Sequence, residues 1–176
     1  MTYPAVRTLA LFLLLSPSLP AAPANSPGGP CAAVQYRAFD FWLGDWDVFD
    51  VGGEATAVAR ARITRILDGC VVHELYESAA GGLRGESYSI YDRTRSLWHQ
   101  TWVTNRGRLL QIEGGQRQDR MMFNGSYLAD DGKSTLIRAL WWPVRDGVRE
   151  RAEISEDAGH TWQPSFDLIF HPHHGK

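Results

Sequence analysis

The chain has 176 residues, with 18 Lys and Arg against 20 Asp and Glu, so its net charge is −2 near neutral pH. Charges of both signs are spread along the chain; no basic patch indicates a nucleic-acid partner, and no block of like charge indicates a charged tail. Without its first residues the chain keeps about 150, the size of one ordinary domain.

The first 24 residues have the three parts of a secretory signal peptide. Arg7 precedes the apolar run TLALFLLLS, and small residues ending at Ala24 offer a cleavage site. The run is far shorter than the ~18 residues of a membrane span, so we expect no stable membrane insertion. These features predict export, to the periplasm or outside the cell, and leave residues 25–36 as an N-terminal extension.

Cys31 and Cys70 are the two cysteines of the chain. An even number of cysteines in an exported protein predicts a disulfide. The bond would tether the N-terminal extension to the loop after the second predicted strand. A metal or redox pair is the alternative, but the spacing lacks a CxxC pattern.

The stretch FDFWLGDWDVFD, residues 39–50, combines two periodicities. Apolar residues up to Trp46 recur at helical spacing, whereas those after it alternate as in a strand. We predict a helical turn over 37–43, broken at Gly44, and a first strand with the Trp46 ring pointing inward. Trp42 and Trp46 are then expected to form a structural plug at one end of the sheet.

From Trp46 onward, alternating segments are separated by Gly, Asp and Asn, as hairpin turns require. The predicted strands cover residues 45–51, 55–66, 71–78, 86–92, 97–103, 108–115, 119–128, 134–143, 148–155 and 161–170. Because no long helical pattern lies between them, the sheet should be antiparallel and meandering. Closure would remove its exposed edges. The sequence therefore predicts an all-β protein, an antiparallel meander of about ten strands closing into a barrel over 37–171, with a disordered tail at 172–176.

SEDAGHTW, residues 155–162, matches the Asp-box pattern of sialidase propellers. A propeller needs several such repeats, and the chain has one. We therefore predict a hairpin turn in which Asp157 accepts backbone N–H groups and Gly159 takes a positive φ.

Several stretches together resemble a widespread family of exported bacterial proteins of unknown function with a lipocalin-like fold. They are FDFWLGDWDV, SYSIYD, WHQTWV, WWP and EISEDAGHTW. Gly44-Asp45-Trp46 is similar to the Gly-x-Trp signature of lipocalins. The resemblance implies a lipocalin-like (calycin) barrel around a small-molecule cavity and no established reaction. The chain lacks the Gly-x-Trp-x-Gly-x-Gly run of nitrobindin-like haem barrels, so we expect no cofactor.

Alternation groups the side chains of the middle strands into faces without deciding which face points inward. We predict that a ligand contacts Glu74, Tyr88, Trp98, Gln100, Trp102, Arg138, Trp142, Arg151 and Glu153. Aromatic walls with few polar anchors suit a small-molecule pocket. An arginine among them would hold a carboxylate or phosphate or pair with Glu74 or Glu153, or would instead pack on Trp46 as part of the plug. His73 and His99 fall on the opposite faces and are expected outside.

The leading prediction is a barrel that binds a small, partly apolar ligand. One alternative is an isomerase, cyclase or hydrolase that uses Glu74 or Glu153 as acid or base. The other is a structural barrel whose core is filled by the seven tryptophans. The sequence contains no recognisable catalytic or metal-binding motif, and the C-terminal His171, His173 and His174 form only a weak metal-type tract.

Overall fold

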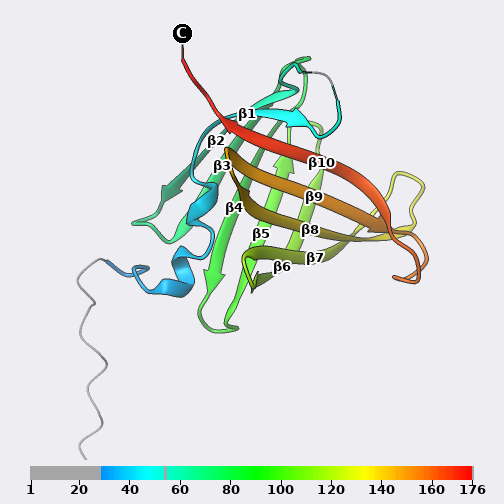
Figure 1. The fold of residues 1–176 in the computed structure, drawn as a ribbon. Coiled ribbons are helices and arrows are strands. Elements are labelled where there is room, and N and C mark those ends of the chain that lie inside the picture. Colours follow the sequence, from blue (N-terminus) through cyan, green and yellow to red (C-terminus); the bar gives the residue numbers. More distant parts are fainter. Residues whose placement is uncertain (1–28, 54, 176) are drawn as a thin grey trace, which may run out of the picture.

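The structure is a computed structural model that describes residues 29–53 and 55–175. The predicted signal peptide at 1–24 lies outside these residues. Within them, two 3₁₀ turns precede ten strands (Figure 1). The elements are η1 Val34–Arg37, η2 Asp40–Trp42, β1 Gly44–Asp50, β2 Ala59–Ile66, β3 Val71–Ser78, β4 Arg84–Asp92, β5 Leu97–Thr104, β6 Leu109–Arg117, β7 Arg120–Leu128, β8 Ser134–Val144, β9 Gly147–Ser155 and β10 Gln163–Pro172. No helix of the described residues is long and apolar enough to cross a bilayer.

The strands form a closed antiparallel meander, which confirms the predicted fold class. Each strand pairs with the next along the chain, and β1 also pairs with β10, from Trp46 opposite Pro172 to Asp50 opposite Leu168. The backbone N–H of His173 then donates to the carbonyl of Asp45 at 2.8 Å. Pairing thus continues past residue 171, where we predicted the barrel to end.

Strand β2 shows how the residue pattern builds the barrel wall. Ala59, Ala61 and Ile63 are buried on the inner face, whereas the alternating Arg60 and Arg62 reach solvent. Successive side chains of a strand point to opposite faces, so each strand contributes one row to the lumen. The small alanines leave room inside for larger rings from other strands.

One end of the barrel is closed by the segment from η2 into β1. The Phe39 ring stacks on Trp42 with 4.9 Å between centroids, and the indole N–H of Trp46 donates to the Trp42 carbonyl at 3.0 Å. A Cβ on Gly44 would lie 2.7 Å from the Trp46 ring, so only glycine lets that ring fold back over the chain. The stretch is a helical turn followed by a strand, as predicted, and Trp42 and Trp46 are both buried in this plug.

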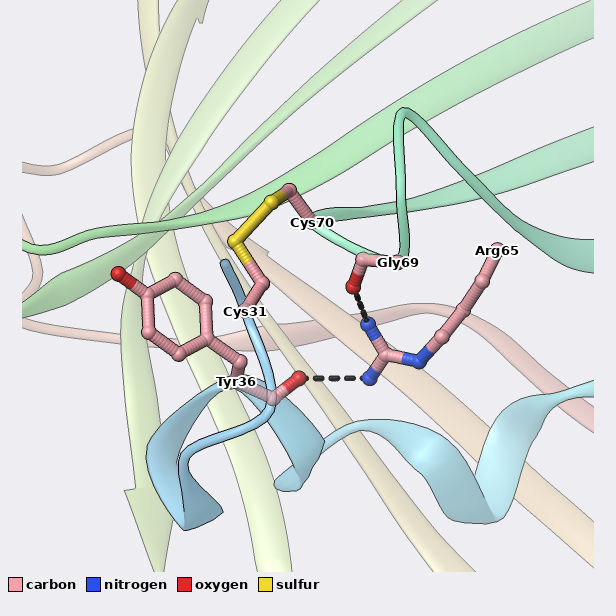
Figure 2. Close-up of a disulfide and its surroundings, with 5 residues drawn as sticks. All are labelled: Cys31, Tyr36, Arg65, Gly69 and Cys70. Carbon is pink, nitrogen blue, oxygen red and sulfur yellow. Dashed lines mark hydrogen bonds between the residues drawn. A yellow bond between two sulfur atoms is a disulfide. The ribbon is translucent and has the colours of Figure 1, made fainter. Parts of the chain in front are cut away.

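Cys31 and Cys70 form a disulfide, with 5.0 Å between their Cα atoms (Figure 2). Cys70 ends the turn between β2 and β3, so the bond attaches the segment before η1 to the closed end of the barrel. Nearby, the ring of Tyr36 packs edge-on against Tyr91 of β4, with 5.1 Å between centroids. The predicted tether is confirmed.

Arg65 at the end of β2 binds both 3₁₀ turns. Its guanidinium donates to the Tyr36 carbonyl at 2.6 Å and to the Gly69 carbonyl at 2.5 Å, as Figure 2 shows. The same group pairs with the Asp40 carboxylate, with Nε 2.6 Å from Oδ1. The Arg65 side chain is only 12% exposed. The turns are therefore fixed to the barrel by one disulfide and one largely buried cation.

The Asp-box stretch forms the hairpin turn between β9 and β10, as predicted. Asp157 accepts hydrogen bonds from the hydroxyl and backbone N–H of Thr161 and from the Ser155 hydroxyl, and these bonds hold the pKa of its carboxyl well below the ordinary range. Gly159 takes a φ of +91°, and the Trp162 indole donates to its carbonyl at 3.2 Å. The motif is a turn in this fold.

Candidate site in the barrel lumen

Aromatic side chains fill the half of the lumen next to the 3₁₀ turns. Phe39 contacts the rings of Trp98, Phe123 and Trp141 with centroid distances of 5.8, 5.8 and 5.5 Å. All four residues are essentially buried. Edge-to-face and tilted contacts of this kind pack a core without voids. These rings occupy the interior of this half of the barrel.

The other half of the lumen is hollow. It holds a cavity of about 430 Å³, lined in part by Asp50, Val58 and Ser78 at the strand ends farthest from the 3₁₀ turns. The lining residues are Asp50, Val58, Glu74, Tyr76, Ser78, Leu83, Gln100, Trp102, Leu110, Ile112, Ile137, Ala139, Trp141, Glu150, Phe166 and Leu168. The cavity is large enough to hold several water molecules, so the tryptophans do not fill the whole lumen.

Small inner residues make this hollow possible. Gly85 on β4 faces Trp102 on β5, and a Cβ at residue 85 would lie 2.2 Å from the indole ring. Ser87, Ser89 and Ala139 are likewise small and buried. Gly85 lets the ring of Trp102, which lines the cavity, lie against the backbone of β4.

Glu74 on β3 is the most deeply buried acid of the cavity, with 5% of its surface exposed. The Ser87 hydroxyl donates to its Oε2 at 2.8 Å and is its sole hydrogen-bond donor among the described residues. Burial raises the pKa of the Glu74 carboxyl from 4.5 to about 7, and the Ser87 bond only partly offsets that rise. A carboxyl deprived of water keeps its proton to a higher pH.

Glu150 on β9 is a second acid in the same cavity. Burial and the charge of Glu74 raise the pKa of the Glu150 carboxyl well above its ordinary value. The indole N–H of Trp141, its neighbour across the β8–β9 pairing, partly offsets the rise. That N–H lies outside hydrogen-bonding geometry toward Glu150 and has no partner among the described residues, although Trp141 is 2% exposed. It is a buried donor left free beside the cavity.

Tyr76 and Asp50 complete the polar lining toward the open end. Burial, together with the charges of Glu150, Glu74 and Asp50, raises the pKa of the Tyr76 hydroxyl to about 12. The Tyr76 and Trp102 rings meet edge to face, with 5.9 Å between centroids. The cavity lining thus contains three carboxyl groups and no Lys, Arg or His.

Of the nine residues predicted to contact a ligand, Glu74, Gln100 and Trp102 line the cavity. The Gln100 amide donates to the Ser89 hydroxyl at 2.9 Å, which holds the amide against the wall. Trp98 also faces inward, but its indole N–H donates to the Gln35 carbonyl in the closed half. Trp98 belongs to the aromatic packing and not to the cavity.

The predicted inward direction of Tyr88 is wrong. Its side chain lies on the outer face of β4, where Tyr88 is 41% exposed, stacks on His73 and donates to Glu86 at 2.8 Å. His73 contacts the same Glu86 on this outer face, as expected for that histidine. His99 also lies outside, with one ring nitrogen 2.9 Å from the Glu113 carboxylate.

The prediction also fails for Arg138, Arg151 and Glu153, which lie outside the barrel. The Glu153 carboxylate takes a hydrogen bond of 2.5 Å from Arg138 and one of 2.7 Å from Arg151. The Arg138 guanidinium lies 4.3 Å from the ring centroid of Trp162 in the β9–β10 turn. Two arginines neutralise Glu153 there, so Glu153 no longer qualifies as the acid or base of a barrel enzyme.

Trp142 and the predicted cation–π plug need the same correction. The Trp142 ring lies on the outer face, 4.9 Å from the Arg120 guanidinium and 5.4 Å from that of Arg149. Among the described residues no arginine lies over Trp46. The largely buried cation at the closed end is Arg65, which binds the carbonyls of Tyr36 and Gly69 and the Asp40 carboxylate.

Glu150, Trp141 and Asp50 were missed by the sequence prediction. On β9, the row Val148, Glu150, Ala152 and Ile154 has three apolar members, whereas the alternating row has two arginines and Glu153. A row with a single charge is the better candidate for a barrel interior. This contrast was the signal available for Glu150.

Two further observations concern other kinds of site on the molecule. A shallower groove of about 670 Å³ on the outer face of β2–β5 is lined by exposed charged side chains, among them Arg62, Glu77 and Arg84. The lumen, which holds buried polar groups, is the stronger candidate. Within the described residues, no group of three or more His, Cys, Asp or Glu is placed to hold a metal ion.

The chain matches no protein-family model and no curated protein. The geometry of the lumen therefore carries the functional argument.

Proposed function

We propose that this protein is an exported, lipocalin-like barrel that binds a small, partly apolar molecule in its lumen. The main observation that supports this proposal is the cavity of about 430 Å³, with aromatic walls and a few polar anchors, in a barrel closed at its other end. Its volume falls within the range of about 300–1,000 Å³ typical of small-molecule sites. The disulfide supports export, because such bonds persist in oxidising compartments.

Ligand titration of the purified, disulfide-intact protein tests this proposal. The neutral dye N-phenyl-1-naphthylamine and a series of fatty acids are added while tryptophan fluorescence is followed. We expect saturable, displaceable binding of at least one probe, because Trp102 and Trp141 lie in the cavity wall. If every probe fails to bind saturably, the proposal is overturned.

Two neighbouring residues on β8 supply a matched pair of variants. Ala139 lines the cavity, whereas Leu140 points outward on the same strand. Ala139→Phe fills the lumen and should weaken dye binding by about tenfold or more, equivalent to about 1.4 kcal/mol. Leu140→Phe should bind as the parent protein does. Circular dichroism of both variants confirms that they fold, and Ile137→Trp provides a second way to fill the cavity.

An enzyme that transfers protons is the second candidate function. Burial raises the pKa of Glu74 to about 7, and general acid–base groups work best near the operating pH. Enolisable ketones and activated esters are the probes for turnover. Proton-transfer catalysis by Glu74 requires that Glu74→Gln abolish the rate while Glu77→Gln, an exposed change on the same strand, leaves it intact. Equal rates in both variants would exclude this candidate.

A further inference from the structure

The charged side chains of the cavity lining are all carboxyls, those of Asp50, Glu74 and Glu150, and among the described residues no Lys, Arg or His lines it. The Gln100 amide N–H is taken by Ser89, and the Ser87 hydroxyl proton by Glu74. The carboxyl of Glu150 and the second oxygen of Glu74 line the same cavity as possible acceptors. Buried acceptors gain most from a ligand that donates hydrogen bonds.

The two inner acids are mutually destabilising when both are ionised. Glu74 on β3 and Glu150 on β9 line one cavity, although the two strands are far apart in the sequence. Among the described residues, no basic side chain lines the cavity with them. Like charges in a space of low dielectric repel, and a cation between them removes the repulsion and attracts both. Without a ligand, burial raises the pKa of both carboxyls, and the charge of Glu74 raises that of Glu150 further.

Two further features of the lining fit a cation that also carries carbon. The rings of Tyr76 and Trp102 form an edge-to-face corner, and Phe166 lines the same cavity. Aromatic faces attract organic cations electrostatically at distances up to about 6 Å. The free N–H of Trp141 lies beside Glu150, where a small shift would let it bond the ionised carboxylate that a cation requires.

We propose that the lumen selects ligands that carry a protonated amine or a similar organic monocation, with Glu74 and Glu150 as the anionic anchors and the aromatic corner holding the apolar part. This inference rests on the proposed function, since it names the chemical class of that ligand. The small-molecule site could exist without this preference, and the test separates the two.

The preference depends on pH in a defined direction. The titratable groups facing the cavity are Glu74 and Tyr76 from β3, Asp50 from β1 and Glu150 from β9; the rest of the lining does not titrate. A protonated amine binds the acids in their ionised form. At pH 7 and below the acids hold protons, so amine binding there must displace these protons. For one carboxyl with a pKa of about 7, the affinity for the amine rises about tenfold between pH 6 and pH 8.

Three compounds of one shape test the preference: 4-phenylbutylamine, 4-phenylbutanol and 4-phenylbutanoate. Isothermal titration calorimetry with the disulfide-intact protein at pH 8 should show the amine binding about tenfold or more tighter than the alcohol, and the carboxylate weakest. Lowering the pH to 6 should weaken amine binding and leave alcohol binding unchanged. Titrations in buffers of different ionisation enthalpy should detect protons released on amine binding at pH 6.

Carboxyl-to-amide variants locate the selectivity. Glu150→Gln and Glu74→Gln should each lower the amine affinity about tenfold and keep the alcohol affinity within about twofold. Retained alcohol binding shows that the lumen still folds. Glu77→Gln, on the outer face of β3, is the matched control and should change neither affinity.

The outcomes separate the inference from the proposed function. Equal affinities for amine and alcohol, or tighter binding of the carboxylate, overturn the amine preference while lumen binding stands. Displacement of the amine by excess calcium chloride reassigns the acids to an inorganic cation and also overturns it. If none of the three compounds binds, and no dye does, the proposed function itself fails.

Discussion

Glu74 and Glu150, which are far apart in the sequence, line the same buried cavity, and the charge of Glu74 raises the pKa of Glu150. In the part of the chain that the structure describes, no Lys, Arg or His lines this cavity beside them. Buried acids in native proteins are normally paired or neutral. Ionising this pair therefore costs folding stability, and a bound cation can relieve that cost.

Replacing Glu74 by Gln should remove a pH-dependent loss of stability. The folded pKa of about 7 exceeds the ordinary 4.5, so the folded protein holds a proton that the unfolded chain releases as pH rises. The contribution of the protonated Glu74 to folding stability is fully present below pH 4.5 and is lost as the pH rises through about 7. The shift corresponds to about 3 kcal/mol at pH 8.

Urea denaturation at pH 5 and pH 8 measures this effect. The parent protein should lose stability between the two values, and Glu74→Gln should lose less and be the more stable of the two at pH 8. Glu77→Gln should follow the parent. A variant that tracks the parent at both pH values would show that Glu74 is not desolvated.

Gly85→Ala should disturb the cavity wall through Trp102. The new Cβ would overlap the indole ring, so the ring has to move into the cavity or the strands have to separate. Overpacking of this kind costs about 1–3 kcal/mol. The measurements are the unfolding midpoint, the tryptophan emission maximum and dye affinity, and all three should change. Gly115→Ala on β6 meets no atom within 4 Å and should change none of them.

Arg65→Ala should loosen the closed end of the barrel. It leaves the Asp40 carboxylate and the carbonyls of Tyr36 and Gly69 without their shared donor. Breaking a buried ion pair costs about 3–5 kcal/mol, and this partly buried one should lie at the lower end. Thermal unfolding measures the loss. Arg62→Ala, an exposed change on the same strand, is the control, and an equal effect of both would refute the assigned role of Arg65.

Removing the disulfide should destabilise the protein, because the unfolded chain gains conformational entropy when the bond no longer constrains it. The bond closes a sequence separation of 39 residues, for which the loop-entropy relation gives about 4 kcal/mol. The double variant Cys31→Ser/Cys70→Ser should unfold at a lower denaturant concentration than the oxidised parent. Reduction of the parent with dithiothreitol should reproduce the same midpoint, and a midpoint insensitive to both treatments would contradict the prediction.

The strands and their order could be predicted because their signals are local. In β2, alternating alanines and arginines define two faces, and the turn that follows contains Gly69 with φ at +84°. Turn residues at each break permit only short connections, so consecutive strands pair. The turn around Asp157 followed from the same local reasoning, because its hydrogen bonds join residues at most four apart.

The candidate site could be predicted only in part, because alternation leaves the choice of face open. On β8, Ile137, Ala139 and Trp141 face the lumen, whereas Arg138 and Trp142 face out. Both rows contain a tryptophan, so aromatic content does not discriminate between them. The arginines suggested an anchor for an anion, but outside the barrel they meet Glu153 and indole rings.

The sequence by itself determined the strands, their antiparallel order, the cysteine tether and the aromatic closure of one end, since each depends on periodicity, turn residues or composition. Only the tertiary structure decided which row of each strand faces inward and which side chains meet there. That choice is made by packing across the barrel, where Phe39 fills one half against Trp98 and Trp141. Both Glu74 and Glu150 line the half left hollow, and no local pattern records that these two strands share a cavity.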